Sequence, residues 1–324
     1  MSAGPYADPD FMTWLRFIPE TTNVDFVGWR YWAFGLDGLL MLASVVSILV
    51  YGFNLGIDFT GGVQMEVKYA RAIDIGKVRS SISGLGFKDT EITYFGGGQC
   101  DQPANSCLLI RVQAESDEAD KGVEQKVRQV LGSGYTFRDT QIIGPKVSQE
   151  LFHSGVYATL LAVVLISLYV AFRFEWQYGV GALIATGHDV FVTAGFFSIL
   201  HMDFTLNTVA ALLLLAGYSI NDTVVVFDRI RENRRKYKRM GLPELINLST
   251  NQIATRTTLV SAATSLSVVP MLFGGAVLLN FSAAILFGIL VGTFSSTYVA
   301  AALLLYLPAP AGTTGGSNTA DASA

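Results

Sequence analysis

The sequence predicts an α-helical membrane protein in which six transmembrane helices carry one folded polar domain between the first helix and the second. Of its 324 residues 51% are hydrophobic and only 15% are charged, whereas a soluble protein carries about a quarter charged residues. The apolar residues gather in blocks of about 20, the length needed to cross a bilayer as a helix. The polar residues gather between the first two blocks, where strand and helix patterns alternate.

The first apolar block covers residues 31–51. We interpret it as a retained membrane anchor, because Gly52-Phe53-Asn54 follows it in place of the small-residue cleavage site of a signal peptide. Five further blocks follow the polar stretch: Phe152–Phe172, Tyr178–Leu200, Phe204–Val226, Ser249–Phe273 and Val277–Leu307.

Basic residues are concentrated between the fourth and fifth blocks: Arg229, Arg231, Arg234, Arg235, Lys236, Lys238 and Arg239. The short loops on the other side, 201–203 and 274–276, contain no Lys or Arg. The positive-inside rule therefore predicts that both termini are cytoplasmic and that the polar domain lies on the outer side of the membrane. The net charge of −4 and a basic cluster that lies beside a span give no reason to expect a nucleic-acid partner.

The polar stretch, residues 54–150, is predicted to form a ferredoxin-like βαββαβ domain. The expected elements are, in order, a strand at 63–69, a helix at 73–83, strands at 90–95 and 108–113, a helix that opens at 116–118, and a strand at 135–143. Asp117 and Glu118 fall in the first turn of the second helix, where the helix dipole favours acids.

Cys100 and Cys107 are the only cysteines and fall in the loop between the two central strands. Outside the cytoplasm the environment is oxidising, so we expect a disulfide that pins this loop, with two free thiols as the alternative. No His or further Cys lies beside them, so neither a metal site nor a cofactor is expected. Ser, His and Asp do not gather in the domain, which suits a binding or mechanical role better than an enzymatic one.

Four ionisable residues lie inside the apolar blocks, where each costs roughly 2.5–3.5 kcal/mol on insertion scales. They are His188 and Asp189 in the third block, Asp222 in the fourth and Arg256 in the fifth. A carboxylate that can exchange a proton near a fixed guanidinium is the minimal equipment of a proton relay, so these four are the candidate relay residues.

The depth of the opposite charges supports this hypothesis. Ser249 and Gln252 fit a capping box, which predicts that the fifth helix begins at Ser249. Asp222 and Arg256 would then both lie roughly 10 Å below the cytoplasmic end, on antiparallel neighbours.

Each candidate also has a structural alternative. Arg256 can snorkel to the cytoplasmic surface, Asp222 can be a static ion, and His188 or Asp189 can be a hydrogen-bonded residue of the bundle. Asp37 in the first block is expected near the cytoplasmic boundary, without a role.

Small residues recur at every fourth position of the sixth block and predict one smooth face for close helix packing: Ala284, Gly288, Gly292, Ser296 and Ala300. Ordinary packing within the bundle accounts for this pattern.

Several longer motifs resemble the SecF side of the SecD/SecF family of protein translocase subunits. They are Arg30-Tyr31-Trp32, Gly56-Ile57-Asp58-Phe59-Thr60-Gly61-Gly62, Gly144 through Leu151, His188-Asp189-Val190, Gly217 through Asn233, Thr255-Arg256-Thr257 and Gly292 through Ser296. Each short motif is weak alone, but the full set occurs in order on the expected spans. Asp37 and the two cysteines match no motif of the family.

The resemblance implies one half of a twelve-span bundle related to resistance-nodulation-division exporters, with SecD as the other half. It implies that the pair uses the proton motive force to assist preprotein export through SecYEG after the ATP-dependent step, with YajC and YidC as further partners besides membrane lipid. In this resemblance Asp222 and Arg256 match the functional acid and arginine. The corresponding domains are 1–30 (cytoplasmic segment), 31–53 (first helix), 54–150 (periplasmic), 151–307 (five-helix bundle) and 308–324 (disordered cytoplasmic tail).

Two other functions have the same span plan. One is a half-size exporter of lipids or small molecules, although the outer domain, residues 54–150, is small for a substrate path. The other is a passive scaffold that holds SecD in the membrane.

Overall fold

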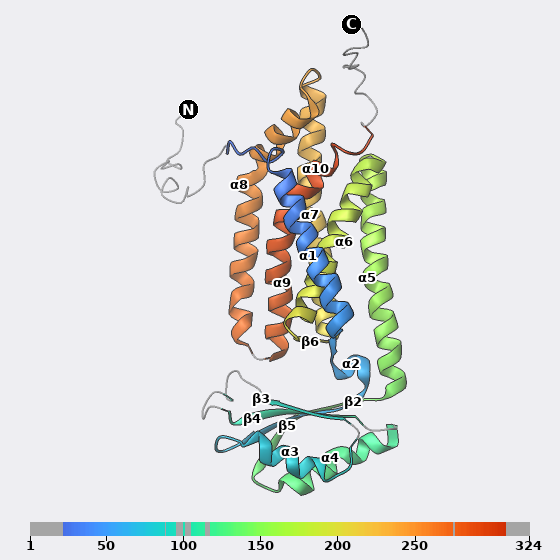
Figure 1. Ribbon diagram of the computed structural model, residues 1–324, viewed down its shortest axis with the longest axis vertical. Helices are drawn as coiled ribbons and strands as arrows, with labels where there is room; N and C mark the ends of the chain where they lie inside the picture. The colour runs from blue at the N-terminus through green and yellow to red at the C-terminus, as the bar shows by residue number, and fades with distance from the viewer. Residues whose placement is uncertain are drawn as a thin grey trace, which may run out of the picture.

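A computed structural model describes residues 22–87, 89–94, 100, 105–113, 117–274 and 276–308. Most of the predicted N-terminal segment, the Gly96–Gly98 part of the loop, Ser116 and the predicted disordered tail lie outside the described residues. Figure 1 shows one long helical bundle with a β-sheet at one end. The start of α1, the turn between α7 and α8, and α10 lie at the opposite end of the bundle.

In the part of the chain that the structure describes, the bundle contains six helices that are long and apolar enough to span a membrane, as predicted. They are α1 (Arg30–Tyr51), α5 (Pro145–Arg173), α6 (Trp176–Ile199), α7 (Leu206–Lys236), α8 (Leu242–Val268, continued by a 3₁₀ turn η3 at Val269–Phe273) and α9 (Ala276–Phe294). A π-helical segment, η4 (Ser295–Ala300), and the short α10 (Ala301–Leu303) prolong α9. Because Pro270 has no N–H to donate, the regular helix α8 ends just before it.

The fifth helix begins earlier than predicted. The capping box at Ser249 is wrong: α8 starts at Leu242, with Pro243 in its first turn, and Leu245 and Ile246 are already buried. The Ser249 hydroxyl instead donates to the Leu245 carbonyl and accepts from Asn233 of α7 at 2.9 Å. The α7–α8 hairpin is therefore helical through most of the basic cluster.

The polar domain has the predicted βαββαβ order. It consists of β2 (Gly62–Tyr69), α3 (Ile75–Ser83), β3 (Asp89–Tyr94), β4 (Cys107–Gln113), α4 (Asp117–Leu131) and β5 (Tyr135–Ile143). The sheet order is β3-β4-β2-β5 with all neighbours antiparallel, which is the ferredoxin-like topology.

The sheet lies between the bundle and the helices α3 and α4 (Figure 1). Alternate residues of β2, Val63, Met65 and Val67, are fully buried in the core that includes Val78 and Val127 of the two helices. Because successive strand residues point to opposite faces, the residues that alternate with these three face the helical bundle. The sequence did not predict the junction at this end, where β1 (Asn54–Leu55) pairs in parallel with β6 (Asp203–Phe204) and α2 (Ile57–Thr60) follows β1.

Candidate functional site: buried ionisable groups around α7

Asp222 lies in the interior part of α7 and is half-buried against the end of α9. The Ser296 hydroxyl donates to its Oδ2 at 2.6 Å. Ser296 belongs to the π-helical segment η4, a rare geometry that is frequent at functional sites. The last residues of the small-residue pattern therefore lie on a widened turn that aims a hydroxyl at the acid.

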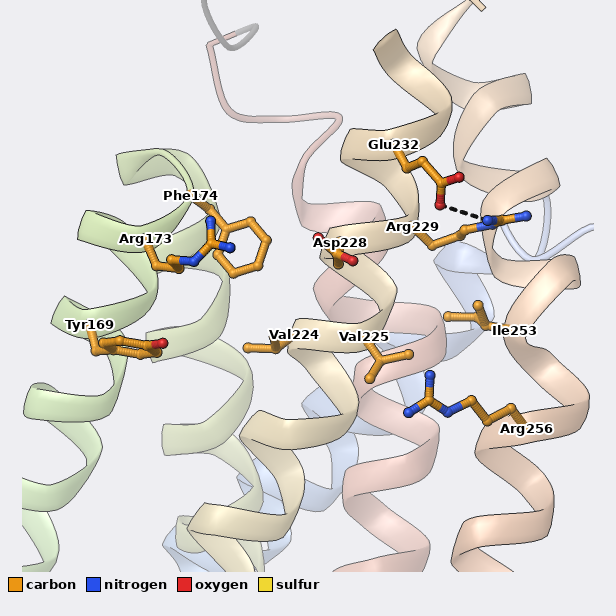
Figure 2. A pocket seen from close by; sticks show the side chains of 10 residues that line it. All are labelled: Tyr169, Arg173, Phe174, Val224, Val225, Asp228, Arg229, Glu232, Ile253 and Arg256. Carbon is orange, nitrogen blue, oxygen red and sulfur yellow. Dashed lines mark hydrogen bonds and ion pairs between the residues drawn. The ribbon is translucent and has the colours of Figure 1, made fainter. Parts of the chain in front are cut away.

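Arg256 extends from α8 into a hollow of about 390 Å³ at the basic end of the bundle (Figure 2). Val224 and Val225 of α7 line this hollow, and Asp228, Arg229 and Glu232 lie at its charged rim, where Arg229 contacts Glu232. Among the described residues Asp222 and Arg256 form no ion pair within 4.0 Å, yet the guanidinium acts electrostatically on the carboxylate. The two candidates are neighbours across α7 and α8 rather than bonded partners.

His188 and Asp189 form a second buried group on α6. The His188 Nδ1 lies 3.1 Å from Asp189 Oδ1, and the Ser219 hydroxyl of α7 donates to Asp189 Oδ2 at 2.5 Å. Asp189 is completely buried, and a Cβ on Gly292 of α9 would lie 3.4 Å from its carboxylate. Gly292 of α9 therefore packs directly beside the acid.

Asp37, which we expected near the cytoplasmic boundary and without a role, is 5% exposed on the face of α1 that packs on α6. Its Oδ2 lies 3.9 Å from His188 Nε2. No local sequence pattern indicates this contact, because α1 and α6 are far apart along the chain.

Arg111 ties the sheet to the bundle and was not predicted. From β4 its guanidinium contacts both carboxylate oxygens of Asp203 at 2.9 and 2.5 Å, and Gln64 and Glu91 accept its other N–H groups. Burial opposes the charge, but the hydrogen bonds and charge of Asp203 outweigh it and raise the pKa of Arg111 above its ordinary value. Asp203 also accepts from the Asn54 side chain at 2.9 Å.

The start of α7 is held from the same junction. The Leu206 N–H, which has no partner within the helix, donates to Asp58 Oδ2 of α2 at 2.8 Å. A carboxylate at a helix N-terminus is stabilised by the free N–H groups and the dipole. One helix, α7, therefore carries Asp222 in its interior and is fixed at its end to the residues that lead into the sheet.

Cys100 and Cys107 form a disulfide with their Cα atoms 5.4 Å apart. The bridge anchors the start of β4 to the loop before it. Within the described ranges no group of three or more His, Cys, Asp or Glu side chains could hold a metal ion.

One face of α7 is not covered by any of the described residues. Its exposed residues inside the span include Leu214, Gly217 and Asn221. A polar side chain such as Asn221 that faces lipid is unfavourable, because the hydrocarbon offers its amide no hydrogen-bond partner.

Within the described residues, six apolar helices surround buried carboxylates and carry a ferredoxin-like domain at one end, which defines a multi-pass membrane protein. The family described as "Protein export membrane protein SecD/SecF, C-terminal" matches residues 123–309, and the SecD/SecF GG motif matches residues 46–73. The chain belongs to the SecD/SecF family of protein-export membrane proteins, on its SecF side. This confirms the resemblance drawn from the motifs.

The chain is similar to the protein translocase subunit SecF of Rhodobacter capsulatus, with 40% identity over 90% of this chain and 91% of the relative. It is 38% identical to SecF of Rickettsia typhi, over 90% of this chain and 94% of that one. The crystal structure of SecDF, a translocon-associated membrane protein from Thermus thermophilus, superposes with a TM-score of 0.79 at 35% identity. That match covers 90% of this chain but only 39% of the SecDF chain.

Proposed function

We propose that this chain works with a SecD subunit to convert proton entry at Asp222 into motion of the ferredoxin-like domain, which assists preprotein export through SecYEG after the ATP-dependent step. The observation that carries the proposal is the course of α7, which runs from the junction with the sheet to Asp222. The proposed role is mechanical and involves no covalent chemistry.

The ends of the bundle support the proposed orientation. The basic α7–α8 turn lies at the end where α1 begins, and the sheet lies at the other end (Figure 1). By the positive-inside rule, the end with the basic α7–α8 turn is cytoplasmic and the end with the sheet is periplasmic.

The uncovered face of α7 supports the proposed partner. A SecD subunit that packs on Gly217 and Asn221 would give the amide a polar environment and allow close helix approach at the glycine. The SecDF chain, of which this chain matches 39%, is long enough to contain such a second half. YajC, YidC and membrane lipid remain further expected partners.

The energy available is sufficient for a conformational switch. One charge that crosses 100 mV releases about 2.3 kcal/mol. Because about 1.4 kcal/mol corresponds to a tenfold change in an equilibrium, one proton can bias two positions of the domain by about fiftyfold.

The test is late-stage, proton-dependent export in inverted membrane vesicles that contain Asp222→Asn together with SecD. We expect proton-dependent export to be lost while the complex assembles. Asp228→Asn, at the rim on the same helix, is the matched control and should retain export. Normal export with Asp222→Asn would refute the proton-driven role and favour a passive scaffold.

A further inference from the structure

Asp37 is a buried acid whose carboxylate has no hydrogen-bond partner within the described part of the chain. Both its oxygens and the Nε2 atom of His188 are fully buried, and none of the three is hydrogen-bonded among the described residues. The Asp37 Oδ2 atom lies 3.9 Å from the Nε2 atom of His188. A buried ionised carboxylate without a partner is strongly unfavourable, so this pair needs a proton between its members.

The position of Asp37 is fixed by the packing of α1 on α6. The buried residues of α1 form one stripe: Ala33, Asp37, Ser44 and Ser47. Gly195 of α6 lets Ser44 approach closely, and the hydroxyls of Ser47 and Ser198 are hydrogen-bonded at 2.8 Å. The acid is therefore held against α6, inside the bundle.

The charges around Asp37 favour binding of one additional proton. The groups whose charges act on Asp37 are His188 and Asp189 of α6. The segment η4 also contacts α1, but none of its described residues carries a charge. An imidazolium between two carboxylates would leave a net charge of −1 in the bundle. One more proton makes the three side chains neutral as a group, which burial favours.

The same three groups continue toward α7. His188 contacts Asp37 through one ring nitrogen and Asp189 through the other, so the imidazole can accept a proton at Nε2 as it releases one at Nδ1. Asp189 accepts from Ser219, which lies one turn before Asp222 on α7, and the charge of Asp189 acts on Asp222.

We propose that Asp37 is a proton-binding residue that shares an exchangeable proton with His188 and forms the α1 end of a path through Asp189 and Ser219 toward Asp222. In each transfer a proton leaves one oxygen or nitrogen as the next accepts it, and no other bond changes. The role in the path rests on the proposed function, whereas the shared proton does not.

Infrared difference spectroscopy of the full chain in lipid nanodiscs, titrated with pH, reads the C=O stretch of protonated carboxyl groups directly. We expect a buried-carboxyl band that is lost in Asp37→Asn and retained in Asp222→Asn. Ser47→Ala, which removes an α1–α6 hydrogen bond but no titratable group, is the matched control and should keep the band. His188→Gln removes the ring that lies beside Asp37 and should therefore shift the pH dependence of the band.

The second readout is the pH profile of proton-dependent export with SecD. Asp37→Asn should shift this profile, and Asp37→Glu should restore it. A band unchanged in Asp37→Asn would overturn the shared proton. Loss of the band without any change in the export profile would overturn the role in the path. Normal export by Asp222→Asn would instead refute the proposed function, while loss of the band in Asp37→Asn would still support the shared proton.

Discussion

Replacing Arg111 with Gln should loosen the ferredoxin-like domain from the bundle without unfolding it. Only 11% of the Arg111 side chain and 23% of the Asp203 side chain are exposed. Removal of one partner from a buried ion pair costs about 3–5 kcal/mol, whereas an exposed pair contributes about 0–1 kcal/mol. Asp203 keeps its contact with Asn54. We therefore expect a loss of about 2–3 kcal/mol in docking free energy, a factor of about 30 to 150 in the docking equilibrium.

Amide hydrogen exchange on the full chain in nanodiscs measures this loss locally. The informative amides are Gly56, which donates to the Phe204 carbonyl at 2.9 Å, and Leu206, which donates to Asp58. Their protection should fall by about the same factor, while β2–β4 amides keep theirs. Arg128→Gln removes an exposed ion pair with Glu124 and should leave the junction unchanged.

Two results would contradict this reasoning. Unchanged protection at Gly56 and Leu206 would mean that Arg111 does not hold the junction. An equal loss throughout the sheet would mean that Arg111 stabilises the domain rather than its docking. A double-mutant cycle with Asp203→Asn isolates the pairwise contribution.

Three further predictions concern packing, the disulfide and pH. Gly288→Val should lower the stability of the bundle by about 1–3 kcal/mol by overpacking, because a Cβ there would overlap the Leu215 side chain. Thermal unfolding in detergent measures this loss. An unchanged unfolding midpoint would exclude the close α7–α9 contact. Replacing both cysteines with Ser should destabilise the domain by about 2–3 kcal/mol, because the disulfide closes only a short loop. Hydrogen exchange of the β4 amides with and without reductant measures this loss. Reductant should have no effect on the double variant. Burial and then Asp139 raise the pKa of Glu66, so the folded domain holds its proton more tightly than the unfolded chain and loses stability as pH rises through that pKa. Glu66→Gln should therefore raise domain stability at pH 7 more than at pH 4, and an equal gain at both values would contradict this cause.

The sequence predicted the fold largely because its strongest signals are local. Apolar blocks of membrane length and a period of two or 3.6 residues define the six helices and the βαββαβ order without any tertiary contact. Helix ends were less certain: Ser249 has the residue type of a cap, but Leu242-Pro243 starts α8 earlier, and the helix continues beyond the apolar block into polar surroundings.

The sequence predicted which residues form the site but not which contacts they make. Asp222 and Arg256 are conspicuous because charges are rare in apolar blocks, whereas the hydroxyl of Ser296 reaches Asp222 through a π-helical turn that has no local sequence signal. Contacts such as Arg111 with Asp203 join residues far apart in the chain, and only the docking of the sheet on the bundle brings them together.

The central claim is that the protonation state of Asp222 is transmitted along α7 to the junction with the domain. Hydrogen exchange at the Leu206 amide in the assembled complex with SecD, compared between the native chain and Asp222→Asn as the mimic of the protonated acid, tests it most directly. The account predicts a changed protection of Leu206 and Gly56 in Asp222→Asn and none in Asp228→Asn. Identical protection at both amides in all three proteins would contradict it.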